Sequence, residues 1–240
     1  MKIQYFKTGY IVSFLSSALW FSALANAQES NARLIELVST AIERLESTPR
    51  SKLSYKISSY ENEEGDISSK VERFDPRQPD ESHWQLISLN GEKPTTKQQK
   101  SYLKERNEPT KEEHSISIRL SELIQVDTLV LLQESDLELI TGFNVNTESL
   151  GINAKDELKG EIRYDKSENY IEEIRIINKA PFSPMFSAEI DSLEVIFQFN
   201  LVGDWVVIQK QAFTMKGTFA FFSEIDEVSI AQYSDYQTVL

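Results

Sequence analysis

The chain contains no cysteine among its 240 residues. Disulfide bonds, thiolate nucleophiles, iron–sulfur clusters and cysteine-bound zinc are therefore excluded. A lipidated N-terminal cysteine is excluded for the same reason. Histidine is scarce as well, since only His83 and His114 occur and neither belongs to a metal-binding pattern such as H-E-x-x-H. The sequence therefore predicts neither a metal site nor a bound cofactor.

Clusters of basic residues and glycine-rich loops are also missing. The formal net charge is −13, and phosphate contacts need grouped Lys and Arg, so we expect no nucleic-acid partner. The eight glycines form no phosphate-binding loop, and G-x-S-x-G is absent. We therefore expect a protein that is not an enzyme. A hydrolase that uses paired acids, for example Asp75 and Asp80, is the enzymatic alternative.

Residues 1–27 have the pattern of a secretory signal peptide. Lys2 and Lys7 supply the positive end, residues 10–24 are apolar apart from serines, and Ala25-Asn26-Ala27 is a small-x-small cleavage signal. We predict cleavage after Ala27 and a periplasmic mature protein. An uncleaved N-terminal anchor is the alternative, although the apolar segment is short and rich in serine for a membrane span.

Residues 28–240 show no shift in composition and are predicted to form one domain. Its first element is a helix over residues 29–47, because apolar residues recur there at three- and four-residue spacing. Pro49 ends this helix, since proline disfavours helical backbone in the residue before it. The resulting apolar stripe can cover a sheet, and consists of Leu34, Leu37, Val38, Ala41, Ile42 and Leu45.

Most of the remaining chain alternates between apolar and polar residues, the pattern of half-buried strands. The longest run covers residues 190–201, and after a turn at 202–204 we expect Trp205, Val207, Phe213 and Met215 on one face. The pattern predicts a mainly β fold, a single unclosed antiparallel β-barrel of about eleven strands in hairpins. The predicted strands are 53–60, 67–74, 84–89, 129–133, 137–144, 158–164, 170–177, 190–201, 205–215, 218–222 and 227–233.

Three segments interrupt the strands. Residues 94–106 are predicted to form a second helix with a Thr95–Gln98 capping box, but only two of them are large and apolar, so this helix is weakly held. Residues 180–186 form an apolar loop that contains two prolines, and residues 116–124 a short helix. We interpret residues 94–106 and 180–186 as a gate; a plain surface excursion is the alternative for the helix.

Aromatic residues exceed what one flat sheet face needs. In a strongly curved sheet they would line a concave interior, which is typical of apolar ligand sites. A solid core is the alternative for each of them. The candidate ligand-binding residues are Trp84, Phe143, Phe182, Phe186, Phe197, Phe199, Trp205 and Phe213.

The signal, the N-terminal amphipathic helix, the antiparallel strands and the inserted helix together resemble the LolA/LolB-like superfamily. Residues 74–106 and the segment SPMFSAEIDSLEVIFQF (183–199) are similar to uncharacterised secreted proteins of this type. The resemblance implies a periplasmic half-barrel with a helical lid over an apolar cavity, and a function in carrying lipoproteins or binding lipids. It also implies an arginine that holds the lid closed, for which Arg50 and Arg73 are the candidates.

The sequence therefore leaves three functions to compare. The first is a periplasmic carrier whose partner is a lipid or an acylated protein. The second is an envelope protein-interaction or sensing module with a protein partner and no bound lipid. The third, an outer-membrane barrel, is disfavoured by the charged helical segments and by the small number of glycines.

Overall fold

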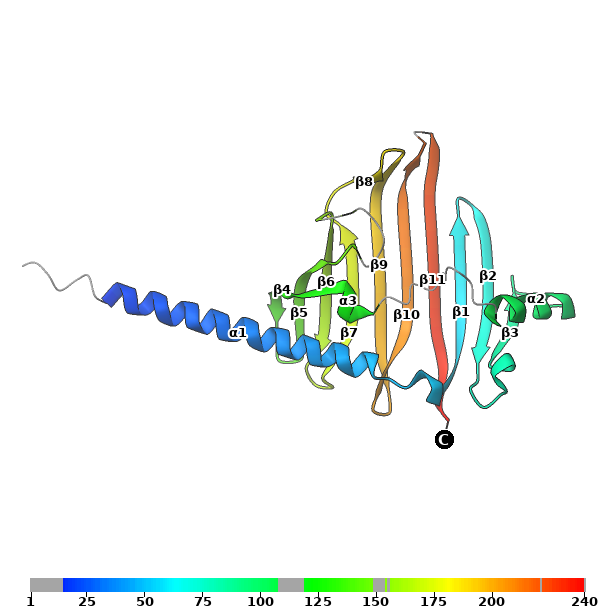
Figure 1. Cartoon of the computed structure of the whole chain (residues 1–240), viewed down its shortest axis with the longest axis horizontal. Helices are drawn as coiled ribbons and strands as arrows, with labels where there is room; N and C mark the ends of the chain where they lie inside the picture. The colour runs from blue at the N-terminus through cyan, green and yellow to red at the C-terminus, as the bar shows by residue number, and fades with distance from the viewer. Residues whose placement is uncertain (1–14, 108–118, 149–153, 155, 221, 240) are drawn as a thin grey trace, which may run out of the picture.

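The computed structural model describes residues 15–107, 119–148, 154, 156–220 and 222–239, with the backbone alone at 15–28, 50, 81 and 107. Within these residues, eleven strands form one antiparallel sheet that does not close (Figure 1). The strand order is β3-β2-β1-β11-β10-β9-β7-β6-β5-β4, and β8 pairs with β9 outside this order. The predicted mainly β, unclosed architecture is confirmed.

The structure contains eleven strands and three helices within the described residues. The strands are β1 (Leu53–Glu63), β2 (Asp66–Phe74), β3 (Trp84–Leu89), β4 (Ile124–Glu134), β5 (Glu138–Val145), β6 (Leu158–Asp165), β7 (Tyr170–Asn178), β8 (Phe182–Met185), β9 (Ala188–Val202), β10 (Trp205–Phe219) and β11 (Ser223–Thr238). The helices are α1 (Leu15–Glu46), α2 (Thr96–Asn107) and α3 (Leu120–Leu123), with short 3₁₀ turns at Arg50–Lys52 and Asp80–Ser82.

Two of the predicted segments differ from the structure, although the strand number agrees. Residues 218–222 are not a separate strand, because β10 continues to Phe219. The expected loop at 180–186 contains the short strand β8, which pairs with β9 at Phe182 and Met185. Pro184 lies between these two pairs, where a missing N–H is tolerated.

A β-bulge reverses the face that we predicted for the start of β10. Ile208 pairs with Phe199, but the next pair is Lys210 with Gln198, so Gln209 is an extra residue. Side chains before the bulge therefore alternate out of phase with those after it. The expectation that Trp205 and Val207 share a face with Phe213 is wrong, because apolar alternation alone does not reveal an inserted residue.

The inner face of the sheet, defined as the face that carries Phe197 and Phe213, is covered by α1 across β4 to β10. The predicted stripe is confirmed, with its buried members Leu34, Val38, Ala41 and Ile42. Arg44, in the last turn of α1, donates to the backbone carbonyls of Glu168, Asn169 and Asp204 at 2.8, 2.9 and 3.3 Å. Apolar burial and these bonds together fix α1 on the sheet.

The second helix, α2, lies at the opposite edge of the sheet and packs on β3 (Figure 1). Its predicted capping box is confirmed, since the Thr95 amide donates to Gln98 Oε1 at 2.8 Å and the Gln98 amide to Thr95 Oγ1 at 3.3 Å. The four residues of α3 confirm the described part of the helix predicted at 116–124. The first three residues of that prediction lie outside the described residues.

The N-terminal part of α1 continues through the predicted cleavage site at Ala27 and extends past the β4 edge of the sheet in Figure 1. Cleavage at that position stays a prediction. Among the described residues, no helix combines the length and the apolar character that a bilayer crossing requires.

A substitution at Gly160 tests how closely the core is packed. Gly160 pairs with Phe143 across β5 and β6, and a Cβ added there would overlap the Phe143 ring. We expect Gly160→Ala to lower the free energy of unfolding by about 1–3 kcal/mol in denaturant titration. Gly142→Ala is the control, because its Cβ would meet only the ends of the Val130 and Leu132 side chains, at 3.3 and 3.4 Å. Equal losses in both variants would contradict this packing.

Candidate functional site

Five of the eight predicted site residues come together in the core beneath α1. Phe143, Phe182 and Phe199 are buried, and Phe197 and Phe213 are half-buried against them. This part of the inner face is filled by side chains, so the three buried residues serve as core and the two half-buried ones flank it. Their neighbours on β6 and β7 are fully buried, among them Ile162, Ile171 and Ile174.

The other three predicted residues lie apart from this core. Trp84 begins β3, next to α2. Phe186 is exposed in the turn between β8 and β9. Trp205 lies on the opposite face of the sheet from Phe213, because of the bulge at Gln209.

The two segments predicted to form a gate are not brought together. α2 packs on β3, whereas β8 pairs with β9, and strands β2, β1, β11 and β10 lie between them in the sheet. Sequence reasoning did not separate them, because hairpin patterns do not reveal which strands become neighbours in the sheet. Only α2 therefore remains a candidate cover.

A buried carboxylate fixes α2 to the sheet. Glu72 Oε1, on β2, accepts from Tyr102 Oη at 2.8 Å and from Arg106 Nη2 at 2.6 Å, while Lys70 Nζ lies 3.5 Å from Oε2. We call Glu72, Tyr102 and Arg106 the Glu72 latch. Tyr102 is the one described side chain of α2 that is buried. Charge and hydrogen bonding, rather than an apolar stripe, therefore hold this helix.

The electrostatics of the latch are mutually supportive. Burial would raise the pKa of Glu72, but the hydrogen bond from Arg106 and the charges of Lys70 and Arg106 hold that pKa below its ordinary value. Burial and the neighbouring carboxylate raise the pKa of Tyr102, so its hydroxyl stays protonated and donates. The latch is therefore intact at neutral pH.

The arginine of the latch is not one of the two candidates from the sequence. Arg73 pairs with Lys56 and Gln85, one position along β2 from Glu72, and so lies on the outer face. The side chain of Arg50 lies outside the described part of the chain. Tyr102 and Arg106 are four residues apart on α2, and this spacing places them on one helix face, a signal that the sequence did contain.

Five half-buried rings lie next to the latch. Tyr55 is central, with ring centroids 5.3 Å from Phe74, 6.1 Å from Trp84, 6.0 Å from Tyr233 and 5.4 Å from Tyr236. We call these five residues the ring cluster. The Arg106 guanidinium lies 4.3 Å from the Trp84 ring centroid, within cation–π range. Arg106 therefore connects the other two latch residues to the ring cluster.

Between α1 and the ring cluster, the inner face of β10 and β11 carries half-buried side chains of mixed character. Register places them on one face, since Gln211 pairs with Phe197 and with Ala231. Tyr233 Oη and Gln211 Oε1 are 3.1 Å apart. We call this surface the central strip: Gln211, Phe213, Ser229, Ala231 and Tyr233.

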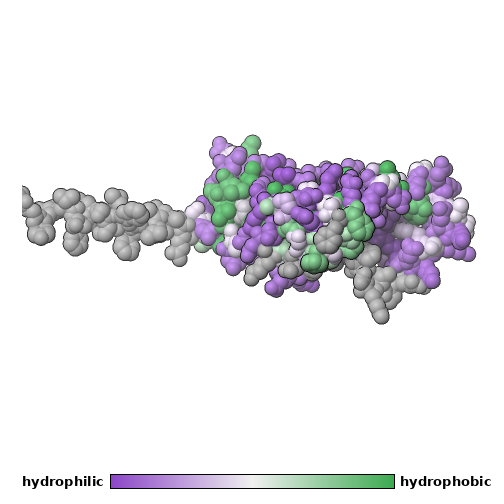
Figure 2. Space-filling view, turned by 90° about the horizontal axis from the view of Figure 1, so that it is seen from above, coloured by the Kyte–Doolittle hydropathy of each residue, from purple (hydrophilic) through white to green (hydrophobic). Residues whose placement is uncertain are grey.

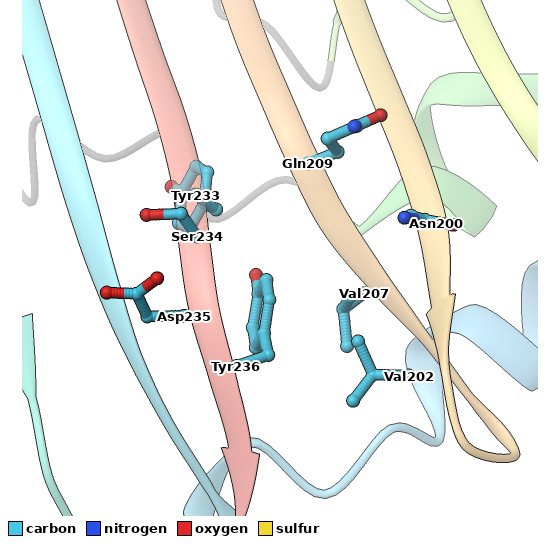
Figure 3. A pocket seen from close by; sticks show the side chains of 8 residues that line it. All are labelled: Asn200, Val202, Val207, Gln209, Tyr233, Ser234, Asp235 and Tyr236. Atoms are coloured by element: carbon cyan, nitrogen blue, oxygen red, sulfur yellow. The ribbon is translucent and has the colours of Figure 1, made fainter.

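A cavity of about 360 Å³ opens where β10 and β11 part (Figure 3). Their pairing ends at Lys210 and Gln232, and Tyr236 stands in the gap, donating to the Ile208 carbonyl at 2.6 Å. None of the predicted site residues lines this cavity, and its lining is largely polar. It consists of Asn200, Val202, Val207, Gln209, Tyr233, Ser234, Asp235 and Tyr236.

The acids suggested for hydrolysis do not form an acid–base pair. Arg77 binds both oxygens of Asp75, at 2.7 and 2.8 Å, and these bonds lower the Asp75 pKa to about 2. A general acid needs a raised pKa, so Asp75 is unsuited to that role. Asp80 instead lies 3.4 Å from His83 Nε2. His114 lies outside the described residues, within which no group of acids and histidines could hold a metal ion.

Comparison with known proteins finds only loose likenesses. No protein-family model matches the chain, and no curated protein matches it. A DUF1329 family protein from Desulfovibrio piger shares 9% identity over 85% of this chain and 93% of its own, with a TM-score of 0.33. MucB, in a structure of its complex with MucA(peri), shares 8% identity over 84% and 99%, with a TM-score of 0.23. Likenesses this low carry no argument about function, and membership of the LolA/LolB-like superfamily stays a prediction.

The latch predicts a pH-dependent stability. The folded-state pKa of Glu72 lies below 4.5, so its contribution is complete above pH 4.5 and is lost as pH falls through the folded-state pKa. We expect Glu72→Gln to lower the free energy of unfolding at pH 7 by about 1–3 kcal/mol. That difference should shrink towards zero in denaturant titrations at acidic pH.

The exposed Glu61, on the neighbouring strand β1, supplies the control. Glu61→Gln should change stability by less than about 0.5 kcal/mol at either pH. A Glu72→Gln loss that is the same at neutral and acidic pH would contradict the ionised latch.

Proposed function

We propose that this chain is a non-catalytic binding protein of the cell envelope, exported by a signal peptide over residues 1–27. Its ligand is the acyl chain of a lipid or of an acylated protein. The ligand binds to the central strip and the ring cluster, and α2 is a displaceable cover beside them. One observation carries this proposal: α2 covers apolar strand residues, and the charged Glu72 latch holds it there.

The anchoring of α2 supports its displacement. Apart from Tyr102, its described side chains are exposed or half-buried. Beneath it lie the buried Leu86 and the half-buried Trp84 of β3. Release of the latch would therefore uncover Leu86 and Trp84, and the only buried side chain described on α2 that would have to leave the sheet is Tyr102.

The surface chemistry suits an amphipathic ligand. Burying each CH₂ group of an acyl chain contributes about 0.8 kcal/mol, and the rings of Phe213 and Tyr55 offer apolar contact. Gln211 and Tyr233 add polar groups on the same face. Side chains fill the core beneath α1, so we place the ligand on the central strip and the ring cluster instead.

Two alanines on opposite faces of neighbouring strands test the site. Ala231 belongs to the central strip, whereas Ala212 is half-buried on the outer face and pairs with Ile230. A tryptophan at position 231 would occupy the space that the acyl chain needs. We expect Ala231→Trp to weaken binding of a fluorescent fatty acid about tenfold, the effect of losing about two buried CH₂ groups, and Ala212→Trp to leave it unchanged.

Thermal unfolding of both variants would show that each retains its fold. Equal probe affinities for Ala231→Trp, Ala212→Trp and the unchanged chain would contradict the proposed site. Absence of any probe binding by the unchanged chain would contradict the proposed ligand class.

The second candidate is a protein-interaction module, and the edge strand β4 favours it. Val130, Leu131 and Leu132 are consecutive on β4 and exposed, and so is Leu137 in the following turn. An exposed apolar edge can accept a strand from a partner. A photo-crosslinker at Leu131 that captures one defined envelope protein, in a chain that binds no fatty acid, would favour this function instead.

A further inference from the structure

A second apolar surface lies at one end of the sheet, away from α2. Met185 ends β8 and Phe186 lies in the turn to β9, while Phe219 ends β10 and Phe222 lies in the turn to β11. Their exposed fractions are 56%, 93%, 47% and 85%. We call these four residues the tip patch. Exposed apolar groups gathered in this way mark interaction surfaces more often than chance.

The two turns are joined by backbone pairing. Phe219 pairs with Ala188 at the end of β9 and β10. Beyond that pair, the Ala220 amide donates to the Ser187 carbonyl at 2.6 Å, which joins one turn to the other. The apolar side chains are therefore presented from a fixed scaffold.

The tip patch is reachable by a flat surface. In Figure 1, the ends of β9, β10 and β11 project beyond the neighbouring strands at the top of the molecule. Figure 2 looks onto this end from above and shows hydrophobic surface set among hydrophilic surface. A planar boundary could contact both turns without first meeting the rest of the sheet.

The charges next to the tip patch restrict the surface that it can meet. Thr218 pairs with Glu189 on one side and Glu224 on the other, so the two carboxylates lie on the same face of the sheet. Both are exposed. At the depth of lipid headgroups they would repel an anionic surface and attract the ammonium of a zwitterionic phospholipid.

We propose that the tip patch docks this protein on the surface of a zwitterionic lipid bilayer, with the apolar side chains in the acyl boundary and Glu189 and Glu224 among the headgroup ammonium groups. Apolar side chains presented at two turns suit a fluid boundary, which needs no complementary groove. The surface lies apart from the central strip and α2, so its test is independent of the proposed acyl site.

Flotation with vesicles of phosphatidylcholine and phosphatidylethanolamine tests the docking. We expect the full chain to bind these vesicles more strongly than phosphatidylglycerol vesicles, and Phe186→Ser/Phe222→Ser to reduce partition by at least about tenfold. Val130→Ser/Leu137→Ser removes two other exposed apolar residues and should leave partition unchanged. The N-terminal segment is the same in every variant and cancels in the comparison.

A direct depth measurement complements the flotation. Measured as the difference from the unchanged chain, which has three tryptophans, the fluorescence added by Phe222→Trp should be quenched by bromine in the lipid acyl chains, whereas that added by Leu137→Trp should not. Unchanged partition of Phe186→Ser/Phe222→Ser, an unquenched Phe222→Trp, or a preference for anionic vesicles would overturn the proposal. So would capture of a protein, without lipid binding, by a crosslinker at Phe222.

Discussion

The buried carboxylate of Glu72 is the interaction on which the account of the α2 end of the molecule depends. A charge that stays buried without its partner costs several kcal/mol, so Glu72 is buried only while Arg106 and Tyr102 are in place. Those two residues belong to α2, and the requirement therefore fixes a helix with almost no apolar face. At the other end, α1 needs no such charge, because Leu34, Val38, Ala41 and Ile42 bury an apolar stripe. One open sheet is thus covered by two helices that differ in how easily they can be removed.

Local patterns predicted much of the fold. Period-two alternation located ten of the eleven strands, because each has one face towards the core. The spacing of apolar residues located α1, and the Thr95–Gln98 capping box located the start of α2. These features depend on neighbours in sequence, which is why the sequence alone revealed them. The exception among the strands, β8, is four residues long and contains a proline.

Features that depend on distant residues were not predictable. The bulge at Gln209 follows from how β10 meets β9, and it moved Trp205 to the opposite face. Glu72 is one of 38 acidic residues, and its partner Arg106 is 34 positions away. The eight predicted aromatic residues were therefore divided between the core and its flank, the central strip, the ring cluster, the tip patch and, for Trp205, the outer face. Of these eight residues, only Phe213 and Trp84 belong to the surface that we now propose for the ligand.

The structure thus describes a sheet with a half-buried strip on its inner face and an apolar tip at its end, and displacement of α2 is the central claim of the proposed function. The chain has no cysteine, so paired spin labels can be introduced at Lys97 on α2 and Ser58 on β1, both of which are exposed. Pulsed electron paramagnetic resonance would then measure the distance between the labels with and without fatty acid. The account predicts a longer or broader distance distribution when fatty acid is bound, and the same change without ligand in Glu72→Gln. An unchanged single distance at saturating fatty acid would contradict it.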